Sequence, residues 1–522
     1  MTNTDFTALL PLLLVSGMSV VVMLAIALRR SHTLTAALTA ATLAAAFVSL
    51  WPAASAAPRQ VTPLLSIDGY ALFYIGLIIA ASLAVTFLAY DYFERLHIQR
   101  EEFYVLLLVS VLGAGVLAAS DHFVSFFLGL ELLSVPLFGL IAYRSGGRLS
   151  LEAGIKYLIL AATSVAFLLF GIALIYADLG TLAFSRMTGG TLLLPGLVFL
   201  MAGFGFKLAL VPFHLWTADV YEGAPAPVTA FISTVSKTAM FALLVRYFAV
   251  SGGRAHPAVT LVFTIVAIAS MIGGTLLALK QDDVKRILAY SSIAHLGYIL
   301  TGFLAGGELA ERAVAYYLAA YTVTLIAAFG VVSALSSARG EPGGVADYSG
   351  LFWTRPALGI VFTGALLSLA GIPLTGGFFA KYFVLAAGAS ASQWALILTL
   401  VVTSGIGIYY YLRILVVLYN RPQLEPVFPR PRPAEAIALA SALALVVWLG
   451  VWPAPMMRII RPFAGAEPRS GYAGPQTRAT PPPRQSGQSS PPPPQSTASR
   501  IATTARSNPS LPPTPRTTPA LR

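Results

Sequence analysis

The stretch LAGIPLTGGFFAKYF, residues 369–383, lies inside an apolar run and combines Pro373, the pair Gly376–Gly377 and Lys381. Proline removes a backbone donor and glycine lowers the cost of leaving helical geometry, so this run is predicted to be a helix that opens just before its lysine. The string GFGFK, residues 203–207, has the same design, because Pro212 follows Lys207 by five residues. The sequence therefore predicts two broken helices, each with a lysine beside the break.

The rest of the chain is typical of a membrane protein. Of its 522 residues 57% are hydrophobic and only 10% are charged, which excludes an ordinary soluble domain. Runs long enough to cross about 30 Å of hydrocarbon as helices predict an all-α polytopic protein with about fourteen transmembrane helices. These runs are 6–28, 34–52, 68–90, 103–119, 122–143, 154–176, 192–212, 226–250, 258–279, 286–305, 312–336, 357–387, 393–419 and 434–455. The first run is read as a retained span, because no cleavage site follows it.

Basic residues in the loops predict which side each loop lies on. With the N-terminus outside, only Arg59, Arg186, Arg254 and Arg312 fall in external loops. The cytoplasmic loops then carry Arg29, Arg30, Arg95, Arg100, Arg144, Arg148, Lys280, Lys285, Arg286, Arg339, Arg355, Arg421, Arg430 and Arg432. The two broken spans that carry Lys207 and Lys381 are five spans apart along the chain. Because this number is odd, the two helices cross the membrane in opposite directions. An internal duplication with inverted topology is therefore expected.

The lysines are few and unusually placed. There are six, and Lys156, Lys207, Lys237 and Lys381 lie inside apolar runs. A buried ammonium can lose its proton, whereas a guanidinium stays charged. Lysine in preference to arginine at these positions indicates groups that exchange protons.

Glu131, in FLGLELLSVPLFGLIAYR (127–144), is the acidic residue placed well inside a span. A carboxylate at that depth needs a partner or a watery cavity, and Lys207 is the expected partner; a hydrogen bond that only packs helices is the alternative. Lys237, in FISTVSKTAMFALLVR (231–246), follows Ser233 by four residues and Ser236 by one. This polar stripe suggests a water-lined path.

Three further groups have open roles. Lys156 stands near the start of its span, where it could relay protons or extend its ammonium to the membrane surface. His214 and His295 could pass protons between lysines and bulk water, since imidazole titrates near neutral pH. A packing role is the alternative for each histidine.

The sequence argues against electron transfer in this chain. It contains no cysteine, so thiolate-bound iron–sulfur clusters and thioether-linked haem are excluded. The GAGVLA string at 113–118 matches a dinucleotide pattern only in its letters, because it sits in an apolar span where small residues allow close helix packing.

Four motifs resemble the N-subunit family of bacterial NADH-quinone oxidoreductase, respiratory complex I, over roughly residues 1–460. They are PFHLWTADVYEGAPAPVTAFISTVSKTAMFALLVR from Pro212, FLGLELLSVPLFGLIAYR, KRILAYSSIAHLGYIL from Lys285, and SLAGIPLTGGFFAKYF from Ser368. The resemblance implies fourteen helices with two inverted five-helix repeats and a central charged axis that carries protons. It divides the chain into helices 1–3 (1–102), a first repeat (103–250), a second repeat (251–420) and a last loop with helix 14 (421–463). A disordered tail rich in Pro, Ser, Thr and Arg (464–522) departs from the family and has no assigned role.

The resemblance also implies roles for individual residues. Glu131 matches the glutamate that tunes the neighbouring lysine, Lys207 the pumping lysine, Lys237 the central connecting lysine and Lys381 the lysine on the second broken helix. Lys156 and His214 also fall on positions of the polar axis.

The implied setting is the bacterial inner membrane. No cofactor is expected in this chain, and FMN and iron–sulfur clusters are expected in other subunits of the complex. The implied partners are the antiporter-like paralogues and other membrane subunits, the lipid bilayer and the quinone that the complex uses; nucleic acid is not expected. Two other hypotheses remain open at this point, a Na⁺/H⁺ antiporter subunit without a redox partner and a purely structural subunit.

Overall fold

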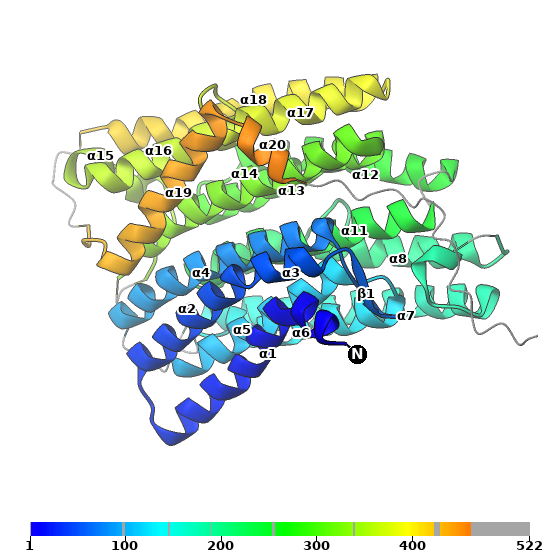
Figure 1. Ribbon diagram of the computed structural model, residues 1–522. Helices are drawn as coiled ribbons and strands as arrows, with labels where there is room; N and C mark the ends of the chain where they lie inside the picture. The colour runs from blue at the N-terminus through cyan, green and yellow to red at the C-terminus, as the bar shows by residue number, and fades with distance from the viewer. Residues whose placement is uncertain are drawn as a thin grey trace, which may run out of the picture. The chain divides into compact units, whose positions relative to one another are not determined.

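The computed structural model describes residues 2–96, 100–144, 147–187, 189–252, 256–337, 340–421 and 428–460. The predicted tail at 464–522, and the loop residues Arg254 and Arg339, lie outside these ranges. Almost all of the described chain is helical (Figure 1). The elements of the first half are α1 (Asn3–Leu28), α2 (His32–Val48), α3 (Leu50–Ala56), β1 (Arg59–Thr62), β2 (Leu65–Ile67), α4 (Gly69–Leu96), α5 (Glu101–Ala119), α6 (Phe123–Ile141), α7 (Arg148–Leu179), η1 (Phe184–Arg186), α8 (Leu193–Lys207), α9 (Trp216–Gly223), α10 (Ala226–Phe231), η2 (Ile232–Ser236) and α11 (Lys237–Ser251). Those of the second half are α12 (Pro257–Leu279), α13 (Val284–Ala305), α14 (Gly307–Ala334), η4 (Val345–Tyr348), α15 (Leu351–Thr354), α16 (Pro356–Ala370), α17 (Gly376–Ser390), α18 (Trp394–Tyr419), α19 (Pro433–Val451) and α20 (Ala454–Ile459).

The prediction of an all-helical membrane protein is confirmed. Within the described ranges, twelve helices are long and apolar enough to span a membrane. Two shorter apolar helices, Leu193–Lys207 and Pro356–Ala370, are the first halves of the two broken runs. The count of fourteen spans and the inverted five-helix repeats remain predictions. The antiparallel pair of β1 and β2 forms a short hairpin before α4.

Both breaks occur where the sequence predicts them. α8 ends at Lys207, the segment 208–215 is not helical, and α9 begins at Trp216. α16 ends at Ala370 and α17 begins at Gly376, with Gly371 at φ +85° in the left-handed region between them. Gly377 is required at the second break, because a Cβ at this position would overlap the carbonyl oxygen of Ser368. Proline and close backbone contact therefore both act to interrupt the helices.

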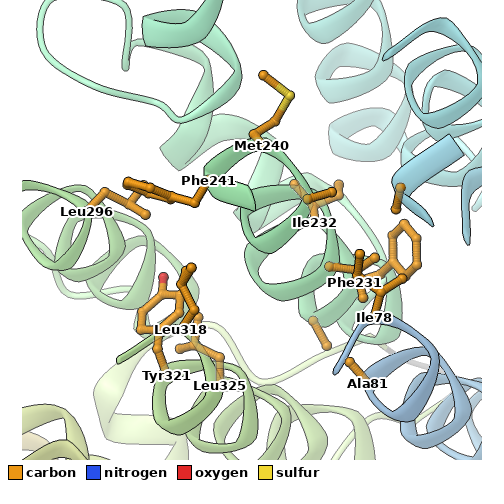
Figure 2. Close-up of a cluster of buried hydrophobic side chains, with 14 of the residues drawn as sticks. Ile78, Ala81, Phe231, Ile232, Met240, Phe241, Leu296, Leu318, Tyr321 and Leu325 are labelled. Atoms are coloured by element: carbon orange, nitrogen blue, oxygen red, sulfur yellow. The ribbon is translucent and has the colours of Figure 1, made fainter. Parts of the chain in front are cut away.

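Three spans form the centre of the described bundle. In Ala226–Ser251 every residue of the most apolar 18-residue stretch is buried. In Gly307–Ala334 and Val284–Ala305 the buried share of this stretch is 94% and 89%. In the other nine candidate spans of the described chain, the buried share is between 33% and 67%, so these helices leave apolar side chains for lipid or for other proteins. Figure 2 shows part of the central packing: Phe231 lies beside Ile78 of α4, and Leu318, Tyr321 and Leu325 of α14 lie on another side of the central helix.

The glycines of the GAGVLA string serve helix packing, as expected. A Cβ at Gly113 would collide with the backbone of Leu132 and Leu133 on α6, so α5 and α6 approach each other at backbone distance here. The string lies inside α5, so its glycines follow helical residues and not a strand. It is therefore a contact between helices and has none of the surroundings of a dinucleotide site.

Candidate functional site

The first lysine of the site lies at the end of a half-helix. Lys207 is the last residue of α8, and its side chain is buried at 3% exposure. Its Nζ donates a hydrogen bond to Ser134 Oγ on α6 at 2.6 Å and lies 5.4 Å from the ring centre of Tyr157. A buried ammonium is thus held by a hydroxyl and an aromatic face.

Glu131 lies beside this lysine without a direct ion pair in the described structure. It precedes Ser134 by one helical turn, so both side chains project from the same face of α6. Its Oε1 is buried and has no hydrogen-bond partner, and Lys207 bonds to the hydroxyl of Ser134. The hydrogen-bond partner of Lys207 is therefore Ser134, on the same face of α6 as Glu131, and no ion pair joins Glu131 to Lys207 within the described residues.

Lys237 is the central lysine and directly follows a turn of π-helix, η2. Such turns interrupt regular helix and are frequent at functional sites. The Nζ of Lys237 donates to Ser292 Oγ on α13 at 2.6 Å, and Tyr321 Oη on α14 donates to the same oxygen at 2.6 Å. In the described chain no carboxylate lies within ion-pair distance of Lys237. The hydroxyl of Ser233 in the predicted polar stripe donates to the Ala230 carbonyl, and the water-lined path stays a prediction.

Lys381 is bound by the break of the second interrupted helix. Its Nζ donates to the carbonyls of Leu369 and Ala370 at 2.9 Å each, and to Ser404 Oγ at 2.8 Å. These carbonyls belong to the C-terminal end of α16, where the last C=O groups have no partner in the helix and carry partial negative charge. The break therefore creates the acceptors that hold the ammonium.

His295 lies between the sites of Lys237 and Lys381. Its Nδ1 and Nε2 are 2.7 Å and 3.2 Å from the hydroxyls of Tyr317 and Tyr411, and its ring lies 5.6 Å from that of Tyr321, the donor to Ser292. A cavity of about 10 Å³, measured as the space open to the centre of a water molecule, is lined by residues that include His295, Tyr321 and Leu369. This is room for about one water molecule. Polar groups thus extend from the acceptor of Lys237 to an acceptor of Lys381.

Lys156 and His214 lie outside this buried series. The side chain of Lys156 is 43% exposed and pairs with Glu152 and Asp219 at 2.7 Å each. Asp219 also accepts from Arg286 at 2.9 Å, so Lys156 belongs to a charge cluster that joins α7, α9 and α13. His214 is in the non-helical segment after α8, half-buried, and its Nδ1 is buried without a hydrogen-bond partner.

Sequence reasoning missed the groups that hold the lysines. Ser134, Ser292 and Tyr321 accept or share hydrogen bonds at the centre of the site. The position of Ser134, one turn after Glu131, is the only one of these with a signal in the sequence. Asp219 was also missed, although it lies in the motif that begins at Pro212.

The described residues contain no group of three or more His, Asp or Glu side chains arranged to hold a metal ion. The buried polar groups of the site are lysines, hydroxyls, one histidine and one carboxylate. Such groups can hold and pass protons.

Two interrupted helices around buried lysines define an antiporter-like membrane protein, and the comparisons with known proteins agree. Residues 120–407 match the family model described as "NADH:quinone oxidoreductase/Mrp antiporter, TM". NADH-quinone oxidoreductase subunit N of Methylococcus capsulatus (strain Bath) is 50% identical over 425 residues, 79% of this chain and 86% of that protein. The chain belongs to the NADH-quinone oxidoreductase subunit N family, as its motifs predict.

Solved structures share the fold. A chain of respiratory complex I from Thermus thermophilus is 33% identical with a TM-score of 0.76, covering 86% of this chain and 98% of that one. A chain of the Mrp complex from Dietzia sp. DQ12-45-1b has a TM-score of 0.79, covering 88% and 96%, at 22% identity. The second likeness concerns the fold alone, whereas the closer sequence relation favours the oxidoreductase hypothesis over the antiporter one.

Proposed function

We propose that this chain is the proton-translocating membrane subunit N of a bacterial NADH-quinone oxidoreductase in the inner membrane. One observation carries the proposal: Lys207, Lys237 and Lys381 are buried and bonded to hydroxyl and carbonyl oxygens, with no carboxylate at ion-pair distance in the described structure. A purely structural lysine at this depth would be stabilised best by an ionised partner. Lysines on neutral acceptors are able to gain and lose protons.

The three lysines would act in order. A proton held at Lys207, next to Glu131, would pass to Lys237 and then, through the region of His295, to Lys381. Each lysine returns to its starting state after donating, so the chain moves protons without net chemical change. Moving one charge against 100 mV costs about 2.3 kcal/mol, and this energy would come from NADH oxidation and quinone reduction in other subunits.

The redox chemistry would be a property of the whole complex. FMN and iron–sulfur clusters would reside in other subunits, since this chain has no cysteine to ligate a cluster. Its partners would be the antiporter-like paralogues and the other membrane subunits, with lipid covering the remaining apolar surface. The division into two inverted repeats would place one broken helix in each half.

The test is NADH-driven acidification of inverted membrane vesicles that carry Lys207→Ala. Assembly is checked on native gels, and Lys280→Ala, at an exposed lysine directly after α12, is the control. The proposal predicts a loss of acidification in the assembled Lys207 variant and normal rates in the control. Full acidification by the assembled variant would refute the role of Lys207, and sodium flux driven by a pH gradient without NADH would indicate the antiporter alternative.

A further inference from the structure

An apolar groove of about 200 Å³ lies where α4, α14 and α19 meet. We call it the lateral groove. Larger side chains such as Phe87, Ile437 and Leu445 border it, and Ile437 and Leu445 are 60% and 43% exposed. The groove therefore opens at the surface of the described chain. Small side chains between the larger ones leave the hollow, namely Ala80, Ala81, Ala84, Ala438, Ser441 and Ala442.

The lateral groove covers about the depth of one lipid leaflet. Asp91 on α4 accepts from the backbone N–H of Glu435 on α19 at 2.8 Å, which gives the two helices a common level. With a rise of about 1.5 Å per residue, the groove runs along α19 from about 3 Å to about 15 Å below this level, from Ile437 to Leu445. The hydrocarbon core is about 30 Å thick. The groove thus lies in the half nearer the start of α19 at Pro433, which is the cytoplasmic half in the predicted topology.

The lining of the lateral groove suits hydrocarbon better than water. Apart from Thr322 and Ser441, its side chains are aliphatic or aromatic. Thr322 is 1% exposed, and its Oγ1 lies 3.3 Å from Thr238 Oγ1, so this hydroxyl is engaged inside the protein. An ordered water molecule makes about three hydrogen bonds, and this lining does not offer them. One acyl chain matches both the apolar surface and the depth.

A basic residue lies at the cytoplasmic end of the lateral groove. Arg432 directly precedes α19, its side chain is 44% exposed, and its guanidinium is 3.8 Å from Glu94 on α4. Glu94 is bound more closely by Arg100, at 2.6 Å. The neighbouring Arg95 donates to both carboxylate oxygens of Glu435. Arg432 is therefore the cation placed to meet an anion at the membrane surface.

We propose that the lateral groove holds one acyl chain of an anionic phospholipid from the cytoplasmic leaflet, and that the phosphate of this lipid lies on Arg432. Arginine suits phosphate because its planar guanidinium can donate two parallel hydrogen bonds. A transmembrane helix, about 10–12 Å wide with its side chains, could cover the groove but not enter it. The inference goes beyond the proposed function, because it uses only the packing and charge of three spanning helices.

The experiment maps the lipid that stays bound to the intact complex. Cells are grown on a fatty acid with a diazirine in the middle of its chain, so that their own phospholipids carry the probe. The complex is purified in detergent, washed free of loosely held lipid and checked on native gels. It is then irradiated, and the lipid adducts are located by mass spectrometry of its peptides.

Two pairs of variants separate the acyl-chain site from the phosphate site. Ser441→Phe places a ring in the groove from an exposed lining position, and Ala440→Phe, at the exposed neighbouring position outside the lining, is its control. Arg432→Gln removes the phosphate contact. Arg430→Gln is its control, because Arg430 is exposed and lines a different pocket at the start of α16.

The expected result is adducts of anionic phospholipid on the segments 77–87 and 437–445, which line the groove. Ser441→Phe should abolish them, and Arg432→Gln should lower their yield about fivefold, the effect of one basic residue at an anionic membrane surface. Both control variants should keep the wild-type yield. The absence of adducts on these segments in the intact wild-type complex would overturn the inference and indicate that another subunit covers the groove. Adducts of zwitterionic lipid that Arg432→Gln leaves unchanged would overturn the assignment of the headgroup.

Discussion

Replacing Ser292 with alanine tests the centre of the proton path. The Ser292 hydroxyl accepts hydrogen bonds from Lys237 Nζ and Tyr321 Oη, both at 2.6 Å. A hydrogen bond to a charged group contributes about 1.5–3 kcal/mol, and its loss leaves a buried donor unsatisfied. If Lys237 must hold a proton during each cycle, a loss of this size slows translocation about 10- to 150-fold.

The assay is NADH-driven acidification in inverted vesicles, normalised to the amount of assembled complex on native gels. Ser82→Ala is the matched control, because Ser82 is also a fully buried serine but its hydroxyl donates only to the carbonyl of its own helix at Ile78. The Ser292 variant should lose most of its proton pumping while Ser82→Ala keeps it. Equal rates for the two variants would refute the reasoning that Lys237 depends on this acceptor.

Two further substitutions test the framework around the site. Glu435→Ala removes the fully buried carboxylate that accepts two hydrogen bonds from Arg95, at 2.8 and 3.0 Å. Leaving the Arg95 charge unpaired costs about 3–5 kcal/mol, so thermal melts of the complex should show early release of this subunit. An unchanged melt would contradict the structural role of the pair. Gly377→Ala forces a Cβ onto the Ser368 carbonyl and should impair proton pumping by displacing the second helix break. Gly405→Ala is the control, because a Cβ at this position meets open space, and it should leave pumping unchanged. Normal pumping by Gly377→Ala would show that the close contact is dispensable.

The breaks could be predicted from sequence because their causes are local. Pro212, Pro373 and the glycines act on the backbone within a few residues of their own position, and both half-helices end or begin where these residues indicate. The lysines were found by a second local signal, namely a charge inside an apolar run.

The acceptors could not be predicted, because their identity depends on contacts between helices. The chain has many hydroxyls inside spans, and only the packing of α13 against α11 makes Ser292 the partner of Lys237. The same holds for the α16 carbonyls that bind Lys381, since any helix end offers such groups. The sequence left Lys156 open between a proton relay and an ammonium that extends to the membrane surface; in the structure its side chain is 43% exposed and pairs with Glu152 and Asp219.

The central claim is that the buried lysine series carries protons that are coupled to electron transfer. The most direct test is NADH-driven acidification, measured together with quinone-linked NADH oxidation, in vesicles carrying Lys237→Ala within a complex shown intact on native gels. The account predicts that both rates fall together, because coupled oxidation requires the proton path. Normal rates of acidification and oxidation in the intact variant would contradict it and reduce the lysine series to a structural role.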